Sequence, residues 1–266
     1  MFGVVTDAPL IVAANRDERL DRPAIPMTVL RPSDPRILGG QDLLAGGTWL
    51  AVNEHGVVAG LTNQPSANGR DPSKRSRGEL PLAFAVHRTA AEAVDAVSSE
   101  LDPAAYNPCW MLVGDRETLF AIGISGAGKP DVEQLGPGLH VLENAPLRPE
   151  SAKAMFVRGL VAEALSGRDE PDAAVTIAAL ETVLGDHRPS VPEPRMDSTG
   201  RVWPPSISAA CVHADGYGTR SAMIVSVPAA DRQALRTAAS GLPVPTVLVA
   251  DGPPCQTPMQ DATSLW

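Results

Sequence analysis

The hydrophobic and polar positions divide the chain into short apolar runs separated by turn residues. The run at residues 10–14 ends directly in four polar or charged residues, 15–18. Because an apolar run rich in β-branched residues is typical of a buried strand, we expect these polar groups at the rim of a sheet, where sites are commonly built. A buried strand followed by a solvated, charged turn explains the same pattern equally well.

The same pattern predicts the other elements of secondary structure. Further strands are expected at residues 2–5, 48–52, 57–62, 110–114, 118–124, 138–142, 208–213, 221–227 and 246–250. Helices are expected from residue 80 onward and at 90–101, 150–165, 172–184 and 231–239, with Thr89 as the N-cap of the second helix and Glu92 at its capping-box position. The proline-containing stretches 22–35 and 189–205 are expected to be loops.

The strands come in pairs that suit antiparallel sheets, and the helices cluster between them. This order predicts an α+β fold in which a largely antiparallel sheet system is covered by helices, without the regular alternation of a dinucleotide-binding fold. We expect a single domain over residues 1–251 and a poorly ordered tail over 252–266, because that tail is rich in proline and polar residues.

Composition narrows the classes of function. The chain has 266 residues, of which 44% are hydrophobic and 20% charged, and a net charge of −9, so nucleic acid is not an expected partner. No signal peptide or transmembrane run is evident, and we expect a cytoplasmic protein without membrane insertion. Three widely spaced cysteines argue against a disulfide framework and against a cysteine-rich zinc site, and no histidine pair has metal-ligand spacing. No metal and no cofactor are therefore expected.

Five residues are candidates for catalysis because of their side chains and their places at strand ends or in turns. Asparagine amides suit an oxyanion hole, an arginine suits a carboxylate, and an aspartate can hold an amine or guanidinium. Each residue also has an ordinary explanation, since asparagine is common in turns. The candidates are Asn15, Asp17, Asn63, Asn144 and Arg220. Arg16, Trp49 and Arg77 are candidates for substrate binding, although core packing would also explain Trp49.

Several short motifs, in one order along residues 10–227, carry a family resemblance. They are Ala-Ala-Asn15-Arg16-Asp17-Glu18, Arg22-Pro23, Gly46-Gly47-Thr48-Trp49-Leu50, Leu61-Thr62-Asn63, Ser76-Arg77-Gly78-Glu79-Leu80, Asn144 and Tyr217-Gly218-Thr219-Arg220. This combination resembles the NRDE family, the transport-and-Golgi-organisation protein family. The resemblance implies an N-terminal-nucleophile hydrolase fold, which is a four-layer αββα sandwich of two antiparallel sheets.

The wider superfamily contains amidases with an N-terminal cysteine. Their Asn-x-Asp string is similar to Asn15-Arg16-Asp17, their oxyanion asparagine to Asn63, a later strand-end asparagine to Asn144, and a C-terminal arginine to Arg220. One departure is important: family members usually begin Met-Cys, whereas this sequence begins Met1-Phe2.

Two functions follow from the resemblance. The first is an amide hydrolase or acyltransferase, in which a cysteine thiolate attacks an amide carbonyl, its α-amine acts as base, Asn63 and Asn144 stabilise the oxyanion and Asp17 orients the amine. The second is a non-catalytic protein that binds haem, a lipid or an acyl-CoA, as the roles of eukaryotic relatives imply. The sequence as written predicts no acyl transfer; either the protein is a binder, or Met1 is an internal start and a Met-Cys lies upstream. The expected partner is a small amide, acyl or haem-like molecule.

Overall fold

The smaller of two sheets is built around the strand that begins at Leu10. The computed structural model describes residues 1–66, 69–168, 170–197, 200–230 and 242–266. Within them, this sheet has the strand order β1-β12-β13-β14, with β11 also paired to β12, and all its pairs are antiparallel. Its strands are β1 (Leu10–Arg19), β11 (His213–Ala214), β12 (Tyr217–Val227), β13 (Thr246–Ala250) and β14 (Gln260–Asp261).

The larger sheet is an antiparallel meander in which seven strands follow one another in sequence order. Its strands are β2 (Ala24–Arg31), β3 (Ile37–Asp42), β4 (Leu50–Asn53), β5 (Val58–Asn63), β6 (Cys109–Gly114), β7 (Leu119–Ile124) and β8 (Asp131–Gln134). A separate two-stranded ribbon joins β9 (Arg195–Met196) to β10 (Val202–Trp203). Three short 3₁₀ turns lie at Pro103–Ala105, Pro205–Ser208 and Thr263–Leu265.

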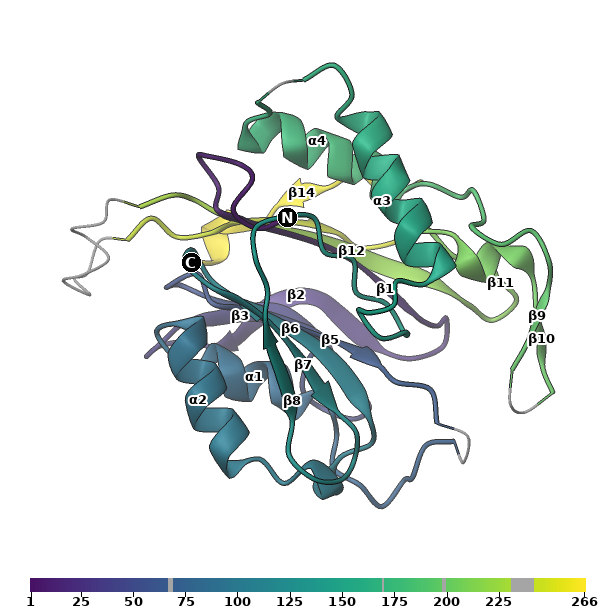
Figure 1. Cartoon of the computed structure of the whole chain (residues 1–266), viewed down its shortest axis with the longest axis horizontal. Coiled ribbons are helices and arrows are strands. Elements are labelled where there is room, and N and C mark those ends of the chain that lie inside the picture. Colours follow the sequence, from purple (N-terminus) through teal and green to yellow (C-terminus); the bar gives the residue numbers. More distant parts are fainter. Residues whose placement is uncertain (67–68, 169, 198–199, 231–241) are drawn as a thin grey trace.

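Helices cover the outer face of each sheet, so that the chain forms four layers in the order αββα (Figure 1). Helices α1 (Glu79–Ala85) and α2 (Ala90–Glu100) lie on the larger sheet, and α3 (Ala152–Ala164) and α4 (Ala173–Leu184) lie on the smaller one. The αββα sandwich of two antiparallel sheets expected from the family resemblance is therefore confirmed.

Apolar cores between the layers hold the four layers together. Alternate residues of β1 enter different cores: Leu10 packs between the two sheets, and Ile11 packs under α3 and α4. A third core, which contains Phe84 and Met111, lies between the larger sheet and α1–α2. Because both faces of β12 are covered over residues 222–227, this part of its sequence is a nearly continuous apolar run rather than an alternating one.

Side chains that cap the helices explain where three of them begin. The hydroxyl of Thr89 accepts a hydrogen bond from the backbone N–H of Glu92 at 3.1 Å, as the capping pattern predicts. Ser151 and Asp172 cap α3 and α4 in the same way. The predicted helices therefore begin within two residues of the observed ones.

The proline-containing stretch 22–35 was expected to be a loop, and that expectation is wrong. It contains β2, which lies at the edge of the larger sheet and includes Pro26. An edge strand tolerates proline because its outward N–H groups need no partner, and the β2–β3 register is irregular between Ile25 and Thr28. Strand β3, rich in glycine, was not predicted either.

Three predicted strands differ from the structure. Residues 2–5 form only single bridges from Phe2 to Leu10 and Gly138, and residues 208–213 contribute no more than the start of β11. Residues 138–142 form no strand, because Leu139, Val141 and Leu142 line a cavity instead. The exposed, polar β8 takes the sheet edge in their place. The helix predicted at 231–239 lies outside the described residues.

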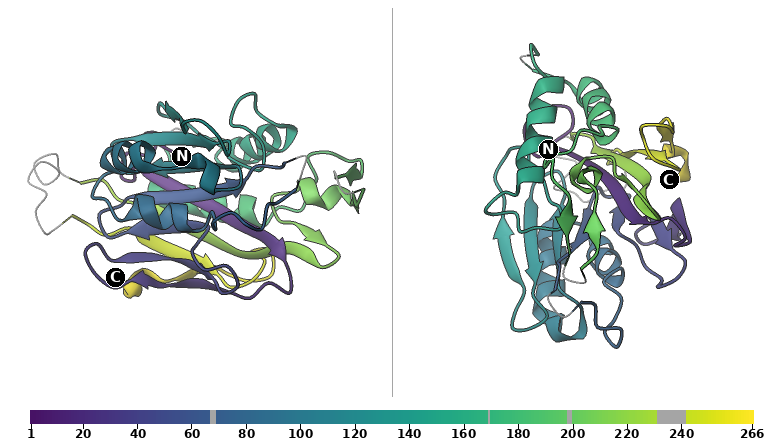
Figure 2. Two further views of the ribbon diagram at one scale, coloured as in Figure 1. Left: turned by 90° about the horizontal axis from the view of Figure 1, so that it is seen from below. Right: turned by 90° about the vertical axis from the view of Figure 1, so that its right-hand side faces the viewer.

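The C-terminal tail is packed, contrary to the expectation of poor order. Strand β14 pairs with β13, and Leu265 and Trp266 contact the core between the sheets. The indole N–H of Trp266 donates to the carbonyl oxygen of Pro245 at 2.7 Å. Figure 2 shows the C-terminal end close to the sheets in both views. The packing of two apolar side chains at the chain end thus orders the tail in spite of its proline-rich composition.

Candidate functional site

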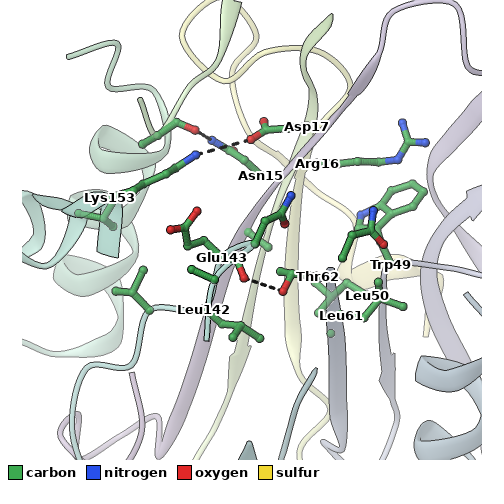
Figure 3. A pocket seen from close by; sticks show the side chains of 18 of the residues that line it. Asn15, Arg16, Asp17, Trp49, Leu50, Leu61, Thr62, Leu142, Glu143 and Lys153 are labelled. Atoms are coloured by element: carbon green, nitrogen blue, oxygen red, sulfur yellow. Dashed lines mark hydrogen bonds and ion pairs between the residues drawn. The ribbon is translucent and has the colours of Figure 1, made fainter. Parts of the chain in front are cut away.

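A large cavity runs along the outer edge of β1. Its volume is about 1510 Å³, and every residue from Leu10 to Glu18 lines it. Strand β1 ends the strand order of its sheet, and within the described part of the chain its outer edge is paired where Met1 and Phe2 meet Ile11 and Leu10. The opposite walls come from β4, β5, residues 139–145 and the inner faces of α3 and α4 (Figure 3).

Asn15 ties together two segments on the helix side of β1. Its amide nitrogen donates to the carbonyl oxygens of Leu184, at the end of α4, and Ala210 at 2.9 and 2.8 Å. Its Oδ1 atom is buried and has no hydrogen-bond partner among the described residues. Both N–H donors of Asn15 are therefore occupied, and only an acceptor remains for a ligand.

Asp17 lies on the same face of β1 as Asn15. The hydroxyl of Thr219 donates to its carboxylate at 2.6 Å, and the Lys153 ammonium of α3 lies 3.9 Å from it. Burial raises the pKa of Asp17 above its ordinary value, and this outweighs the opposing effects of Lys153 and Thr219. Lys153 and Thr219 were not predicted as site residues; Thr219 belongs to a quoted motif, whereas nothing in the helix sequence distinguishes Lys153.

Arg16 points to the opposite side, into the space between the sheets. Its side chain is only 8% exposed, and its guanidinium lies 4.4 Å from the centre of the Trp49 ring (Figure 3). Among the described residues, no oxygen forms a hydrogen bond or ion pair with it. The carboxylates of Glu18 and Asp42 act from farther away, and both pair with Arg22 instead. Burial lowers the pKa of Arg16.

Two glycine motifs place Trp49 and Arg77. Gly47 has φ of +76°, and a Cβ there would lie 2.4 Å from the backbone of Gly78, so the two motifs touch directly. The N–H of Thr48 donates to the carbonyl oxygen of Gly78 at 2.9 Å. The quoted motifs thus form one backbone junction beside the cavity, with Trp49 and Arg77 next to it.

Asn63 and Asn144 lie together at another part of the wall. Both side chains are exposed, and with Arg77 they also line an adjoining depression of about 200 Å³. Asn63 ends β5, and the Thr62 hydroxyl donates to the carbonyl oxygen of Glu143 at 2.8 Å, which holds Asn144 nearby. The sequence predicts Asn144 at the end of a strand, but no strand directly precedes it in the structure. The hydrogen bond from Thr62 to Glu143 helps to position it instead.

Arg220 is not among the residues that line the cavity, contrary to its expected place in the site. The pairing of β1 with β12 skips Arg220, so it is the extra residue of a β-bulge. Its Nη1 atom donates to the carbonyl oxygens of Arg19, Leu20 and Arg22 at 3.1, 2.8 and 2.8 Å. Arg220 therefore holds the turn between β1 and β2. The other seven predicted site residues all line the cavity.

The described residues bring no cysteine to this cavity. Cys109 is fully buried elsewhere, and burial raises its pKa to about 12. The α-amine of Met1 donates to the carbonyl oxygen of Ile11 at 2.7 Å, and burial lowers its pKa to about 5. Ile11 precedes Asn15 by four residues, so this amine is about 13 Å from the polar end of β1 at about 3.3 Å per residue.

The four layers and their antiparallel sheets define the fold of the N-terminal-nucleophile hydrolases. The crystal structure of a mutant conjugated bile acid hydrolase from Clostridium perfringens is similar, with a TM-score of 0.50 over 96% of this chain and 89% of that chain. The identity is 11%, so this likeness concerns the fold alone.

Sequence comparison then gives the family. The family model described as Transport and Golgi organisation 2 matches residues 4–235, and the chain belongs to this family. The human Transport and Golgi organization protein 2 homolog is 34% identical over 236 residues, which are 83% of this chain and 82% of the human protein. The mouse Transport and Golgi organization 2 homolog is 31% identical over 233 residues, with the same coverage. Within the described residues, no helix has the length and apolar character needed to cross a membrane.

Proposed function

We propose that the cavity binds a small amphipathic molecule with an acidic head group. The observation that carries this proposal is Arg16, which is 8% exposed and lines the cavity, and whose guanidinium has no hydrogen-bond or ion-pair partner among the described residues. Burial of a charge without a hydrogen-bond or ion-pair partner costs free energy, which a carboxylate or phosphate at hydrogen-bond distance would offset. The forked donors of arginine suit these groups in particular.

The walls of the cavity suit an apolar body attached to that head group. They include side chains from both faces of β1 and from the facing layers, among them Val12, Ala14, Leu50, Leu112, Leu142, Val157, Val161 and Leu180. The volume of about 1510 Å³ exceeds the roughly 300–1,000 Å³ of common ligand pockets, so a long or broad body has room. The family resemblance adds acyl-CoA and haem as molecules of this kind.

Calorimetric titration of the full chain with laurate tests the proposal. Laurate should bind, and Arg16→Gln should weaken it about 30-fold, which corresponds to about 2 kcal/mol for a charge-assisted hydrogen bond. Arg19→Gln is the matched control, because Arg19 is on the same strand but pairs with Asp21 at the surface. Dodecanol, which has the same chain and no acid, should not distinguish wild type from Arg16→Gln.

Haemin and lauroyl-CoA, titrated in the same way, separate the classes of ligand. If the binding of any of the three acids depends on Arg16, the proposal is supported. The acid that binds most tightly then identifies the apolar body that the cavity prefers. Failure of all three acids to bind, or binding that is unchanged in Arg16→Gln for every acid that binds, would overturn it.

A second candidate function is amide hydrolysis or acyl transfer. Asn63 and Asn144 both line the cavity, and neither side chain forms a hydrogen bond among the described residues, so their amides could donate to an oxyanion. The similar fold of a conjugated bile acid hydrolase supports the same chemistry. The reaction needs a thiolate that none of Cys109, Cys211 or Cys255 brings to the cavity, since none of them lines it.

The intact mass of the natively expressed protein, read with the in-frame codons upstream of Met1, tests this second function. An N-terminal cysteine would support it, and such a protein should release laurate from N-lauroylglycine, with a loss of about 100-fold in Asn63→Ala. A native protein that begins Met1-Phe2 would eliminate the cysteine mechanism. The chain beginning at Met1 should give no release above buffer in either case.

A further inference from the structure

Two cysteines and two histidines meet outside the cavity, where α4 ends. They are His187, Cys211, His213 and Cys255, and one potential ligand atom from each lies within 4.8 Å of all the others. The Sγ atoms of Cys211 and Cys255 are 3.6 Å apart. The Nε2 atom of His213 lies 3.6 Å from the Cys211 sulfur and 3.3 Å from the Cys255 sulfur.

These separations match the edges of a tetrahedron around zinc. With Zn–S near 2.3 Å and Zn–N near 2.0–2.1 Å, tetrahedral geometry places two sulfurs about 3.8 Å apart and a sulfur and a nitrogen about 3.6 Å apart. Both cysteines are free in the structure. We propose that His187, Cys211, His213 and Cys255 form a closed structural zinc site of the Cys₂His₂ type.

The backbone around the four residues is fixed by contacts that need no metal. The N–H of Cys211 donates to the carbonyl oxygen of Asp186 at 2.8 Å, which joins the residue before His187 to the loop that carries Cys211. A Cβ on Gly185 would lie 3.5 Å from the Cα of Cys255, so the third segment packs against the same helix end. The ligands are thus held in place before an ion arrives, and His187 and His213 are exposed enough for it to enter.

The ligand set favours zinc over the harder and the redox-active cations. Two thiolates and two imidazoles suit a borderline-soft ion with tetrahedral preference, and four protein ligands leave no open position for a substrate. The site is therefore structural rather than catalytic.

The proposed zinc site would also hold together segments that form part of the cavity wall. The ion would join the end of α4, the loop before β11 and the segment after β13, which are distant in sequence. The Asn15 amide bridges Leu184 and Ala210, which are three residues before His187 and one residue before Cys211. Zinc and Asn15 thus clamp the same two segments, one from outside and one from the cavity.

Metal analysis of the full chain, purified without chelators and then given one equivalent of Zn²⁺, tests the proposal. Native mass spectrometry should show one zinc per chain. Cys211→Ser and Cys255→Ser should lose it, whereas Cys109→Ser should keep it, because Cys109 is the same residue type buried between other layers. A wild-type chain without stoichiometric zinc, a Cys211–Cys255 disulfide in its place, or full zinc content in Cys211→Ser would overturn the proposal.

Cobalt titration of the unmodified protein keeps the test independent of whether a variant folds. Co²⁺ should give thiolate-to-metal charge-transfer bands and the intense visible bands of tetrahedral coordination, and Zn²⁺ should abolish both. A spectrum that shows the weak bands of octahedral cobalt and no charge-transfer bands would contradict a Cys₂His₂ site.

Discussion

Two buried arginines, Arg16 and Arg116, differ in what surrounds them. Both are 8% exposed. The guanidinium of Arg116 donates from Nε to the carbonyl oxygen of Pro228 at 2.8 Å, and its two terminal nitrogens donate to the carbonyl oxygens of His55 and Pro243. Among the described residues, the guanidinium of Arg16 contacts the Trp49 ring, and Arg16 lines the cavity.

The proposed role of Arg16 in ligand binding rests on this difference. Arg116 uses every part of its fork to hold the β4–β5 turn and the two ends of the connection between β12 and β13, so its burial is compensated within the fold. The charge of Arg16 is not compensated by any hydrogen bond or ion pair among the described residues, and its burial costs stability. In the proposed complex, the acidic head group of the ligand supplies the missing oxygen atoms.

The largest expected effect is on the structural arginine. Arg116→Met removes three hydrogen bonds and leaves three carbonyl groups without their donor, so the free energy of unfolding should fall by about 4 kcal/mol in denaturant titration. Arg148→Met is the control, since Arg148 makes only an exposed ion pair with Glu133 and its loss should cost less than about 0.5 kcal/mol. Equal losses of unfolding free energy in the two variants would show that the hydrogen bonds of Arg116 do not stabilise the fold.

Arg220 should behave as a weaker version of Arg116. Arg220→Met removes the donor shared by three carbonyls of the β1–β2 turn, and unfolding free energy should fall by about 1.5 kcal/mol. Laurate affinity should change less than about twofold, because Arg220 does not line the cavity. A loss of laurate affinity in Arg220→Met comparable to that in Arg16→Gln would show that Arg220 belongs to the binding site after all.

Asp17 gives a dependence on pH whose sign can be worked out. Its folded pKa is raised by burial, so the folded state binds the proton more tightly than the unfolded state, whose pKa is near 3.8. The contribution of Asp17 to stability is therefore greatest below about 3.8 and is lost as pH rises through the raised pKa. The stability of wild type minus that of Asp17→Asn should fall from pH 3.5 to pH 7 in denaturant titrations. A difference that rises with pH would show that the pairing with Lys153 outweighs burial.

The smallest effect on stability is expected at Arg16. Arg16→Met loses the contact with Trp49, worth about 1 kcal/mol, and is relieved of an unpaired buried charge. The two terms oppose each other, so unfolding free energy should stay within about 1 kcal/mol of wild type. A loss as large as that of Arg116→Met would mean that Arg16 has a structural partner, and the comparison would fail.

Much of the fold could be predicted from the sequence because its apolar runs are local signals. Strand β13, the N-cap of α2 and the starts of α3 and α4 to within two residues lie where the pattern places them. The four layers came from the family motifs and not from periodicity. Strand β2 was missed because proline is tolerated on an edge, and residues 138–142 were mistaken for a strand because apolar side chains also line cavities.

The site was predictable to the extent that strand ends gather side chains. Asn15, Asp17, Asn63 and Asn144 line one cavity as expected, but which face of β1 each side chain takes depends on pairing that the sequence does not display. Arg220 was misplaced because a bulge redirects it. The cluster of His187, Cys211, His213 and Cys255 could not be foreseen, since its members come from three distant segments and lack any metal-binding spacing.

The crystal structure of the full chain bound to laurate tests the central claim most directly. The account predicts the carboxylate within hydrogen-bond distance of the Arg16 guanidinium, with the alkyl chain in the cavity beside Val12 and Leu50. Laurate bound elsewhere, or an Arg16 guanidinium that pairs with a protein carboxylate while laurate occupies the cavity, would contradict the assignment of Arg16 as the anion-binding residue.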